Sequence, residues 1–285
     1  MASPTVSSFN AYVFIQTPYL NGYFLEINKL ETIQKIEESL ILEENQRLVR
    51  NRSFSNLDWS REYEEDLHFI SCIISSSNFS GANLDGLHLE NCQIIDCDFS
   101  DASLKNAVFR KCTFYDKNNQ KGCDFQKADL RHSEFDDCDI STCNFYRSEL
   151  FDIKINESQA QGCNFELADF ITIVSKNMLF SSAQLTKSNF KYSDFEGVHL
   201  EKCDLSESNF SAVIFTRANL EGANLTNTAF APSQYYGLSI YKADLRNAEI
   251  AGIDIRALDF SGVEIYEWQM ASLLENIGFI VHPDQ

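Results

Sequence analysis

The sequence has no apolar run that approaches the ~20 residues of a membrane-spanning helix. Its first 20 residues also lack a basic start and a clean apolar stretch, so we expect no signal peptide and a cytoplasmic location. Basic residues are scarce, because 23 Lys and Arg stand against 42 Asp and Glu, for a formal net charge of −19. Nucleic acids and membrane surfaces are polyanions, so this acidity disfavours direct binding to either. It suits a basic protein partner.

Motifs for catalysis and ligand binding are also missing. There is no G-x-S-x-G, no P-loop, no G-x-G-x-x-G and no C-x-x-C, and the five histidines show no ligand spacing. The nine cysteines fit small buried positions better than disulfides or metal sites. We therefore expect that the protein is not an enzyme and that it binds neither a cofactor nor a metal ion. A deep polar pocket would reopen the possibility of an enzyme.

The sequence does contain a repeat with a period of five. From Phe125 to Ile265 there are 29 positions at this spacing, and 26 of them are Phe, Leu or Ile. The residue two places earlier is usually small, and the residue just before is often Asp or Asn. The same period runs from Phe69 to Phe114. Such regularity over about 200 residues points to a repeat architecture.

A period of five fits neither an α-helix at 3.6 nor a strand at 2. It fits a coil that turns a corner every five residues, with four corners and 20 residues per coil. The sequence thus predicts an all-β fold, a right-handed quadrilateral parallel β-helix. Residues 20 apart should stack in columns, one of which is predicted to contain Phe125, Phe145, Phe165, Leu185 and Leu205.

The repeat divides the chain into three predicted parts. Residues 1–66 lack the period and form a partly helical cap, in which Leu30 to Val49 looks helical. Residues 67–265 form the β-helix. Residues 266–285 form a short amphipathic helix, stopped by Gly278, and a tail. An end coil exposes core and unpaired backbone, so we expect this helix and a second subunit to cover it. The predicted dimer interface comprises Trp268, Met270, Leu273, Leu274 and Ile277.

Two interruptions mark candidate functional loops. The step from Phe114 to Phe125 is 11 residues, so residues 115–122 should bulge. Residues 171–179 weaken the repeat without changing its register, with Ser175 at a predicted core position, and a loop is predicted over residues 171–181. The first loop comprises Tyr115, Asp116, Lys117, Asn118, Asn119, Gln120, Lys121 and Gly122, and the second Ile171, Thr172, Ile173, Val174, Ser175, Lys176, Asn177, Met178 and Leu179.

The pattern of a small residue, Asp or Asn, and a large apolar residue resembles the A(D/N)LXX repeat of pentapeptide-repeat proteins. Residues 114–125 resemble the first projecting loop of the Qnr quinolone-resistance proteins within that class. Residues 254–263 and 269–281 are similar to the Qnr C-terminal coil and dimer helix, and residues 158–165 and 200–203 match in order between them. The resemblance runs from roughly Asn78 to Val281.

This resemblance implies a rod-shaped homodimer joined by its C-terminal helices. It implies binding to DNA gyrase and topoisomerase IV, with protection from quinolones, through a rod that resembles DNA and loops that contact the enzyme. The chain departs from the family in about 60 additional N-terminal residues and in a second loop without the expected Arg and Trp.

The charge of the predicted rod supports only partial mimicry of DNA. Residues 123–265 hold 22 acidic and 12 basic residues, a net charge of −10. Seven predicted coils at a strand spacing of ~4.8 Å span about 34 Å, where DNA carries about 20 charges. Two alternatives stay open: protection from a natural topoisomerase poison, and a non-enzymatic interaction scaffold whose partner is recognised by the N-terminal extension.

Overall fold

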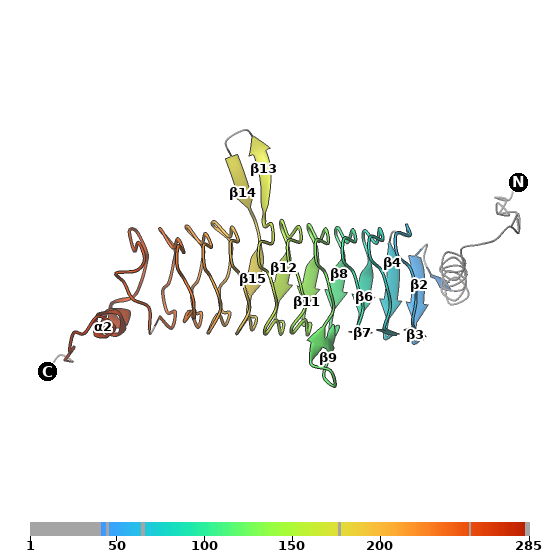
Figure 1. Ribbon diagram of the computed structural model, residues 1–285, viewed down its shortest axis with the longest axis horizontal. Coiled ribbons are helices and arrows are strands. Elements are labelled where there is room, and N and C mark those ends of the chain that lie inside the picture. The colour runs from blue at the N-terminus through green and yellow to red at the C-terminus, as the bar shows by residue number, and fades with distance from the viewer. Residues whose placement is uncertain (1–40, 44–45, 64–65, 176–177, 251, 283–285) are drawn as a thin grey trace, which may run out of the picture.

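The computed structural model describes residues 41–43, 46–63, 66–175, 178–250 and 252–282. Within them the chain winds into a rod of stacked coils (Figure 1). The predicted quadrilateral parallel β-helix with a short C-terminal helix is confirmed. One column of parallel pairs runs the length of the rod, in ten steps that span about 48 Å. Its members are Leu48, His68, His88, Val108, Glu134, Lys154, Gln184, Asp204, Asn224, Asp244 and Glu264.

The strands are short because each occupies one side of a coil. An eight-stranded sheet contains β1 (Ile41–Glu43), β2 (Gln46–Arg50), β4 (Leu67–Ile70), β6 (His88–Glu90), β8 (Val108–Arg110), β11 (Glu134–Asp136), β12 (Lys154–Asn156) and β15 (Gln184–Thr186). A second sheet contains β3 (Ser53–Ser55), β5 (Ile73–Ser75) and β7 (Gln93–Ile95). Two hairpins, β9–β10 (Tyr115–Asp116, Lys121–Gly122) and β13–β14 (Ile171–Ser175, Met178–Ser181), interrupt the rod, and η1 (Glu267–Gln269) and α2 (Met270–Glu275) follow it.

The rod has four flat faces, each named after one core residue of a single coil. Around the rod they follow the order Phe125, Leu130, Phe135 and Ile140, so the Phe125 and Leu130 faces adjoin. The eight-stranded sheet forms the Phe135 face, which Figure 1 shows from the front. Every face has a buried large residue at its centre, with an outward residue before it and another after it.

Local chemistry explains why the five-residue unit turns. At most corners the second residue after the core residue has a positive φ, for example 57° at Lys127, and this left-handed conformation makes the turn. Asp or Asn before the core residue accepts a hydrogen bond from the N–H of the residue after it, as Asp124 does from Gln126 at 2.9 Å. The frequent Asp or Asn before the large residue thus satisfies a backbone N–H beside the turn.

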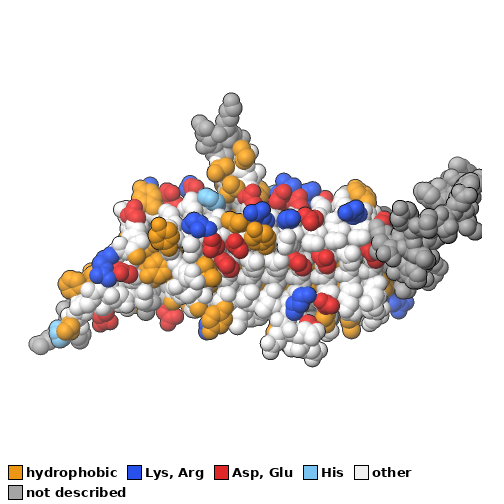
Figure 2. All heavy atoms as spheres, in the orientation of Figure 1, with side chains coloured by type: hydrophobic (Ala, Val, Ile, Leu, Met, Phe, Trp, Pro, Cys, Tyr) orange, Lys and Arg blue, Asp and Glu red, His pale blue; other side chains and the backbone are white. Residues whose placement is uncertain are grey.

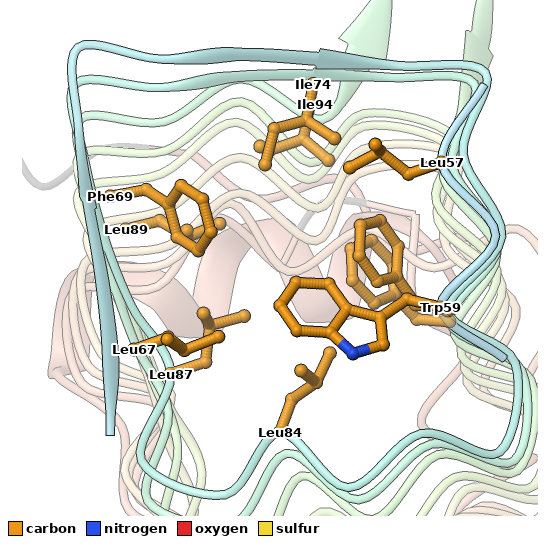
Figure 3. A pocket seen from close by; sticks show the side chains of 11 residues that line it. Leu57, Trp59, Leu67, Phe69, Ile74, Leu84, Leu87, Leu89 and Ile94 are labelled. Carbon is orange, nitrogen blue, oxygen red and sulfur yellow. The ribbon is translucent and has the colours of Figure 1, made fainter. Parts of the chain in front are cut away.

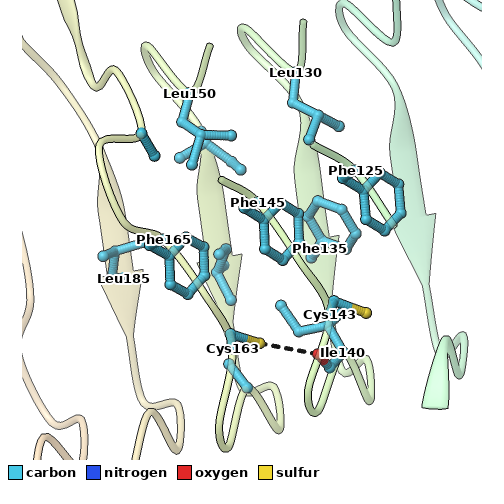
Figure 4. Packing of buried hydrophobic residues seen from close by; sticks show 14 of the residues in the cluster. Phe125, Leu130, Phe135, Ile140, Cys143, Phe145, Leu150, Cys163, Phe165 and Leu185 are labelled. Carbon is cyan, nitrogen blue, oxygen red and sulfur yellow. Dashed lines mark hydrogen bonds between the residues drawn. The ribbon is translucent and has the colours of Figure 1, made fainter. Parts of the chain in front are cut away.

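The interior is filled by stacked side chains. The rings of Phe99, Phe125, Phe145 and Phe165 lie nearly parallel at 4.9–5.1 Å between successive centroids. Figure 4 shows the last three of them. In the first coils, side chains from all four sides point toward the axis and leave a void of about 10 Å³ (Figure 3). A void of this size holds at most about one water molecule.

The nine cysteines lie at small inward positions and are all buried and free. Four of them, Cys72, Cys92, Cys112 and Cys138, form one column. At most other corners the small residue donates its N–H to a carbonyl three residues earlier, as Ala128 does to Phe125 at 3.0 Å. In the column of these four cysteines, called the thiol column below, the N–H of Cys92 instead donates to Sγ of Cys112 at 3.5 Å. These cysteines are therefore hydrogen-bond acceptors as well as small core residues.

The second interruption corrects the predicted columns. Phe165 stacks on Phe195, with centroids 4.6 Å apart, and Leu185 pairs above Ile155. Ten residues, 171–180, leave the rod as a hairpin. Because ten is a multiple of five, the period continues in the sequence while the following coils shift by half a coil. Ser175 is therefore not a core residue, and Phe180 is 51% exposed.

The first interruption also removes residues from the rod. Phe99 stacks on Phe125, 26 residues later, so six residues are inserted. That insertion precedes residue 123. The ten residues of the second hairpin alone therefore correct the predicted length of residues 123–265 from seven coils to six and a half, about 31 Å at ~4.8 Å per coil.

The rod begins one coil earlier than predicted. β2 pairs with β4, and Val49, Phe54 and Trp59 fill the core with the five-residue spacing. The predicted helix from Leu30 to Val49 is wrong over β1 and β2, because pairing with the next coil overrides the local helical pattern. The rest of that predicted helix, and the cap over residues 1–40, lie outside the described residues. The period was hidden because Glu64 stands where the next apolar residue is due.

Replacing the acceptor in the thiol column should destabilise the rod. Cys112→Ala leaves the buried N–H of Cys92 without its partner, so we expect the free energy of unfolding to fall by about 1–3 kcal/mol. Cys112→Ser retains an acceptor, as Ser158 does for Cys138 in the same column, and should cost less. Chemical denaturation of both variants measures the difference. Equal losses would mean that only the volume of the side chain matters.

Candidate partner-binding surfaces

The first predicted loop is a compact polar hairpin. The carboxylate of Asp116 accepts hydrogen bonds from the N–H of Asn118 at 2.8 Å and from Nδ2 of Asn119 at 2.6 Å. The bond from the Asn118 N–H is the main reason that the pKa of Asp116 lies below its ordinary value. Lys121 Nζ lies 3.4 Å from Asp96 of the preceding coil and ties the hairpin to the rod. The loop therefore presents a fixed polar shape.

Gly122 ends this hairpin where the chain passes close to the next coil. A Cβ at this position would lie 2.4 Å from the N of Cys143 and 2.6 Å from the O of Ser141. Since both atoms belong to the backbone, no other residue fits without moving the rod.

The second loop projects further and is apolar where its side chains are described. Ile173 is 75% exposed and Leu179 54% exposed, and they face each other across β13 and β14. Ser181 Oγ donates to the carbonyl of Glu201 at 2.5 Å and anchors the base. Phe180, which the sequence pattern placed in the core, belongs to this exposed group and contacts the ring of Phe151. Side chains of the predicted residues 174–178 lie outside the described set.

A cleft of about 190 Å³ lies at the base of the second hairpin, with an apolar wall from the hairpin and a polar floor from the rod. On the floor, Lys202 Nζ is 2.5 Å from Glu201, and this bond raises the pKa of Lys202. The lining residues are Ile171, Leu179, Phe180, Ser181, His199, Glu201, Lys202 and Asn219.

The C-terminal end is closed by a side chain that the sequence did not single out. Gln269 is fully buried, and its Nε2 donates to the carbonyls of Leu245 and Ala248 at 2.9 and 2.8 Å. Its Oε1 accepts from the N–H groups of Asn247 and Tyr266 at 3.1 and 2.8 Å. One amide thus satisfies four backbone groups of the last coils, where no further coil follows, and it fixes the position of η1 and α2.

The predicted dimer residues divide into two groups. Trp268 and Met270 are 60% and 49% exposed, and Leu274 and Ile277 are partly buried. Leu273 is only 6% exposed, because it packs into the core of its own rod. Leu273 therefore offers little surface to a second copy, and the predicted interface depends on the other four residues. Three exposed residues that were not predicted, Tyr266, Phe279 and Ile280, extend the apolar surface at this end.

The structure does not bring the three regions together. The first hairpin leaves the edge between the Ile140 and Phe125 faces, and the second leaves the edge between the Leu130 and Phe135 faces. These edges are diagonally opposite, and Figure 1 shows the hairpins on opposite sides of the rod. The apolar C-terminal surface lies at one end, so a partner that touches all three must surround part of the rod.

Two of the histidines that looked scattered in the sequence meet on the Phe135 face. The rings of His68 and His88 lie 4.4 Å apart, and burial is the main cause of the lowered pKa of both. Across the described parts of the chain, no three His, Cys, Asp or Glu residues are arranged to hold a metal ion. No helix in the same residues has the length and apolar character needed to cross a bilayer.

Comparisons with known proteins agree with the repeat. A model of the pentapeptide repeat region matches residues 87–165, and a model of eight pentapeptide repeats matches residues 193–230. Pentapeptide repeat protein QnrB4 of Escherichia coli is 37% identical over 84 residues, which cover 30% of this chain and 39% of the relative. Quinolone resistance protein QnrB96 of Scandinavium goeteborgense is 36% identical over 87 residues, 41% of its length. The chain thus spans about two fifths of the curated relatives that it matches.

Solved structures extend the similarity along the rod. A trypsin-treated variant of QnrB1, described as a plasmid-mediated fluoroquinolone resistance protein, matches with a TM-score of 0.64 and 28% identity over 84% of this chain and all of that chain. Full-length QnrB1 matches with a TM-score of 0.57 and 29% identity over 81% of this chain. Period, fold and relatives agree, and the chain is therefore a pentapeptide-repeat protein that resembles the Qnr quinolone-resistance proteins.

Proposed function

We propose that this protein binds the type II topoisomerases DNA gyrase and topoisomerase IV and protects them from quinolones or from a natural poison. It acts in the cytoplasm as a non-enzymatic, partial mimic of DNA, and does not itself bind nucleic acid. The observation that carries this proposal is the match to the whole of the solved QnrB1 chain at 28% identity, which supports a Qnr-like role.

The geometry of the rod agrees with this role. It is about 48 Å long at ~4.8 Å per coil, and its interior is filled rather than hollow. Chemistry on a small substrate needs a pocket with converging polar groups, whereas the two hairpins present broad outward surfaces. The polar first hairpin and the apolar second hairpin supply contacts that charge alone does not.

The C-terminal surface supports a homodimer. Trp268, Met270 and Phe279 expose large apolar side chains beside the last coil, where Phe260 and Ile265 are only partly buried. Exposed apolar surface at the end of a solenoid is a common site of association. A second copy placed there would continue the rod in the opposite direction.

We expect the purified protein to restore supercoiling by DNA gyrase in the presence of a quinolone. Relaxed plasmid, gyrase and an inhibitory drug concentration are combined with increasing amounts of the protein, and supercoiled product is measured on a gel. No recovery over a wide range of protein concentrations would contradict the proposed function.

Each hairpin can be removed without disturbing the repeat. Deleting residues 116–121 joins Phe114 to Phe125 at the five-residue spacing and places Gly122 at the corner, where a positive φ is needed. Deleting residues 171–180 joins Phe170 to Leu185 at the same spacing and keeps the anchor Ser181. We expect both deletions to keep the unfolding midpoint within a few degrees and to reduce rescue of gyrase at least about tenfold, a loss of ~1.4 kcal/mol of binding. Full rescue by either variant would show that its hairpin is not a contact.

Removing exposed apolar side chains from the C-terminal surface should produce monomers. We expect the double variant Trp268→Ala and Met270→Ala to sediment as one chain where the wild type sediments as two at micromolar concentration. Both side chains are largely exposed in the single chain, so its unfolding midpoint should change little. A dimer that persists in this variant, or a wild type that is monomeric, would contradict the proposed interface.

A further inference from the structure

The outward charges are distributed unevenly among the four faces. Among the described residues directly before and after each core residue, the Phe125 face has seven carboxylates and one cation, and the Leu130 face has seven and two. The Phe135 face has six and four, and the Ile140 face has two and one. Two adjoining faces therefore hold a net charge of −11, and the other two hold −3.

The corners reduce this contrast without removing it. The edge shared by the two acidic faces has four basic residues and one acidic residue, Asp101. These five charges change the net charge of that side from −11 to −8. The edge between the Phe135 and Ile140 faces adds a net charge of −1, so that side has a net charge of −4. The basic residues on the acidic edge are Arg61, Lys127, Arg147 and Arg217.

Ion pairs show where the acidic side stays uncompensated. Near its N-terminal end, Lys105 and Arg131 hold Asp129 at 3.3 and 2.5 Å. Further along, Glu196 is ion-paired with Arg217, whereas Asp194, two residues before it on the Phe125 face, has no ion pair within the described residues. Burial and the carboxylate of Glu196 raise the pKa of Asp194, although Asp194 accepts a hydrogen bond from the N–H of Glu196. The Phe135 face differs, because acidic and basic side chains lie close together on it (Figure 2).

The two hairpins lie on the outer borders of the acidic side. The first leaves the far edge of the Phe125 face, and the second leaves the far edge of the Leu130 face. A surface that covered both acidic faces would therefore meet a polar hairpin at one rim and the apolar Ile173, Leu179 and Phe180 at the other.

We propose that the Phe125 and Leu130 faces, bordered by the two hairpins, form one docking surface for a concave basic protein surface, and that the Phe135 and Ile140 faces point away from it. This assignment rests on the proposed function, in which the basic surface belongs to DNA gyrase and normally holds DNA. Complementary charge favours this occupant. The diagonal placement of the hairpins favours a concave shape, because a flat surface cannot touch both.

Two triple variants of equal charge test the assignment. The acidic-side triple replaces three carboxylates of the two acidic faces: Glu166→Gln, Glu196→Gln and Glu221→Gln. The opposite triple replaces three carboxylates of the other side: Glu207→Gln, Glu249→Gln and Glu264→Gln. Each triple removes three negative charges from a total of −19, and each contains one ion-paired residue, Glu196 with Arg217 or Glu264 with Arg246. Differences between the triples therefore report position and not total charge.

The binding of fluorescently labelled protein to intact DNA gyrase is measured by anisotropy at fixed low salt. Each exposed charge contributes little alone, and three on one surface act together, so we expect the acidic-side triple to bind at least about fivefold more weakly. The opposite triple should change affinity less than about twofold. Equal weakening by both triples, or greater weakening by the opposite triple, would overturn the face assignment alone. Absence of binding by the wild type would overturn the proposed function, and the assignment with it.

Discussion

The whole rod depends on backbone hydrogen bonds between one coil and the next. Most N–H and C=O groups on a face pair with the residue one coil away, as in the column from Leu48 to Glu264. Every buried backbone group must find such a partner, so each side of a coil must have the same length as the side below it. This requirement sets the five-residue unit and the positive φ at its corners. It also explains the thiol column, in which Cys112 Sγ serves the N–H of Cys92 in place of a turn carbonyl.

The same constraint determines where the molecule can vary. A segment can be inserted only at a corner and only if the chain returns to the position that it left. The six inserted residues at the first hairpin and the ten at the second both meet this condition. Gly122 lets the first hairpin rejoin the stacked coils against the backbone of Cys143, and Ser181 anchors the second hairpin to the carbonyl of Glu201. The rod ends by a related device, because Gln269 supplies the hydrogen bonds that a further coil would make.

Outward positions are free of this constraint, and so they can hold the information for recognition. Charge, shape and apolar contact are separated in this protein. Carboxylates concentrate on two adjoining faces, the hairpins stand at their borders, and exposed apolar side chains gather at the C-terminal end. The side chains that fill the rod are Phe, Leu, Ile and small residues that pack tightly. A stiff support of this kind holds distant contact regions at fixed positions, which lowers the entropic cost of binding a large partner.

Along most of the rod the sequence alone determined which residues point inward, because the period of five is a local property; Phe180 in the second hairpin and the first coil are the exceptions. The buried cysteines, the two interruptions and the short C-terminal helix followed from it. Only the tertiary structure decided which coil lies above which, since a ten-residue insertion leaves the period unchanged and shifts Phe165 from Leu185 to Phe195. β2 is a strand of the rod because it pairs with β4, although its local sequence pattern predicts a helix. The burial of Leu273, the cap formed by Gln269 and the gathering of carboxylates on two faces likewise depend on residues that are distant in the chain, so no local pattern predicts them.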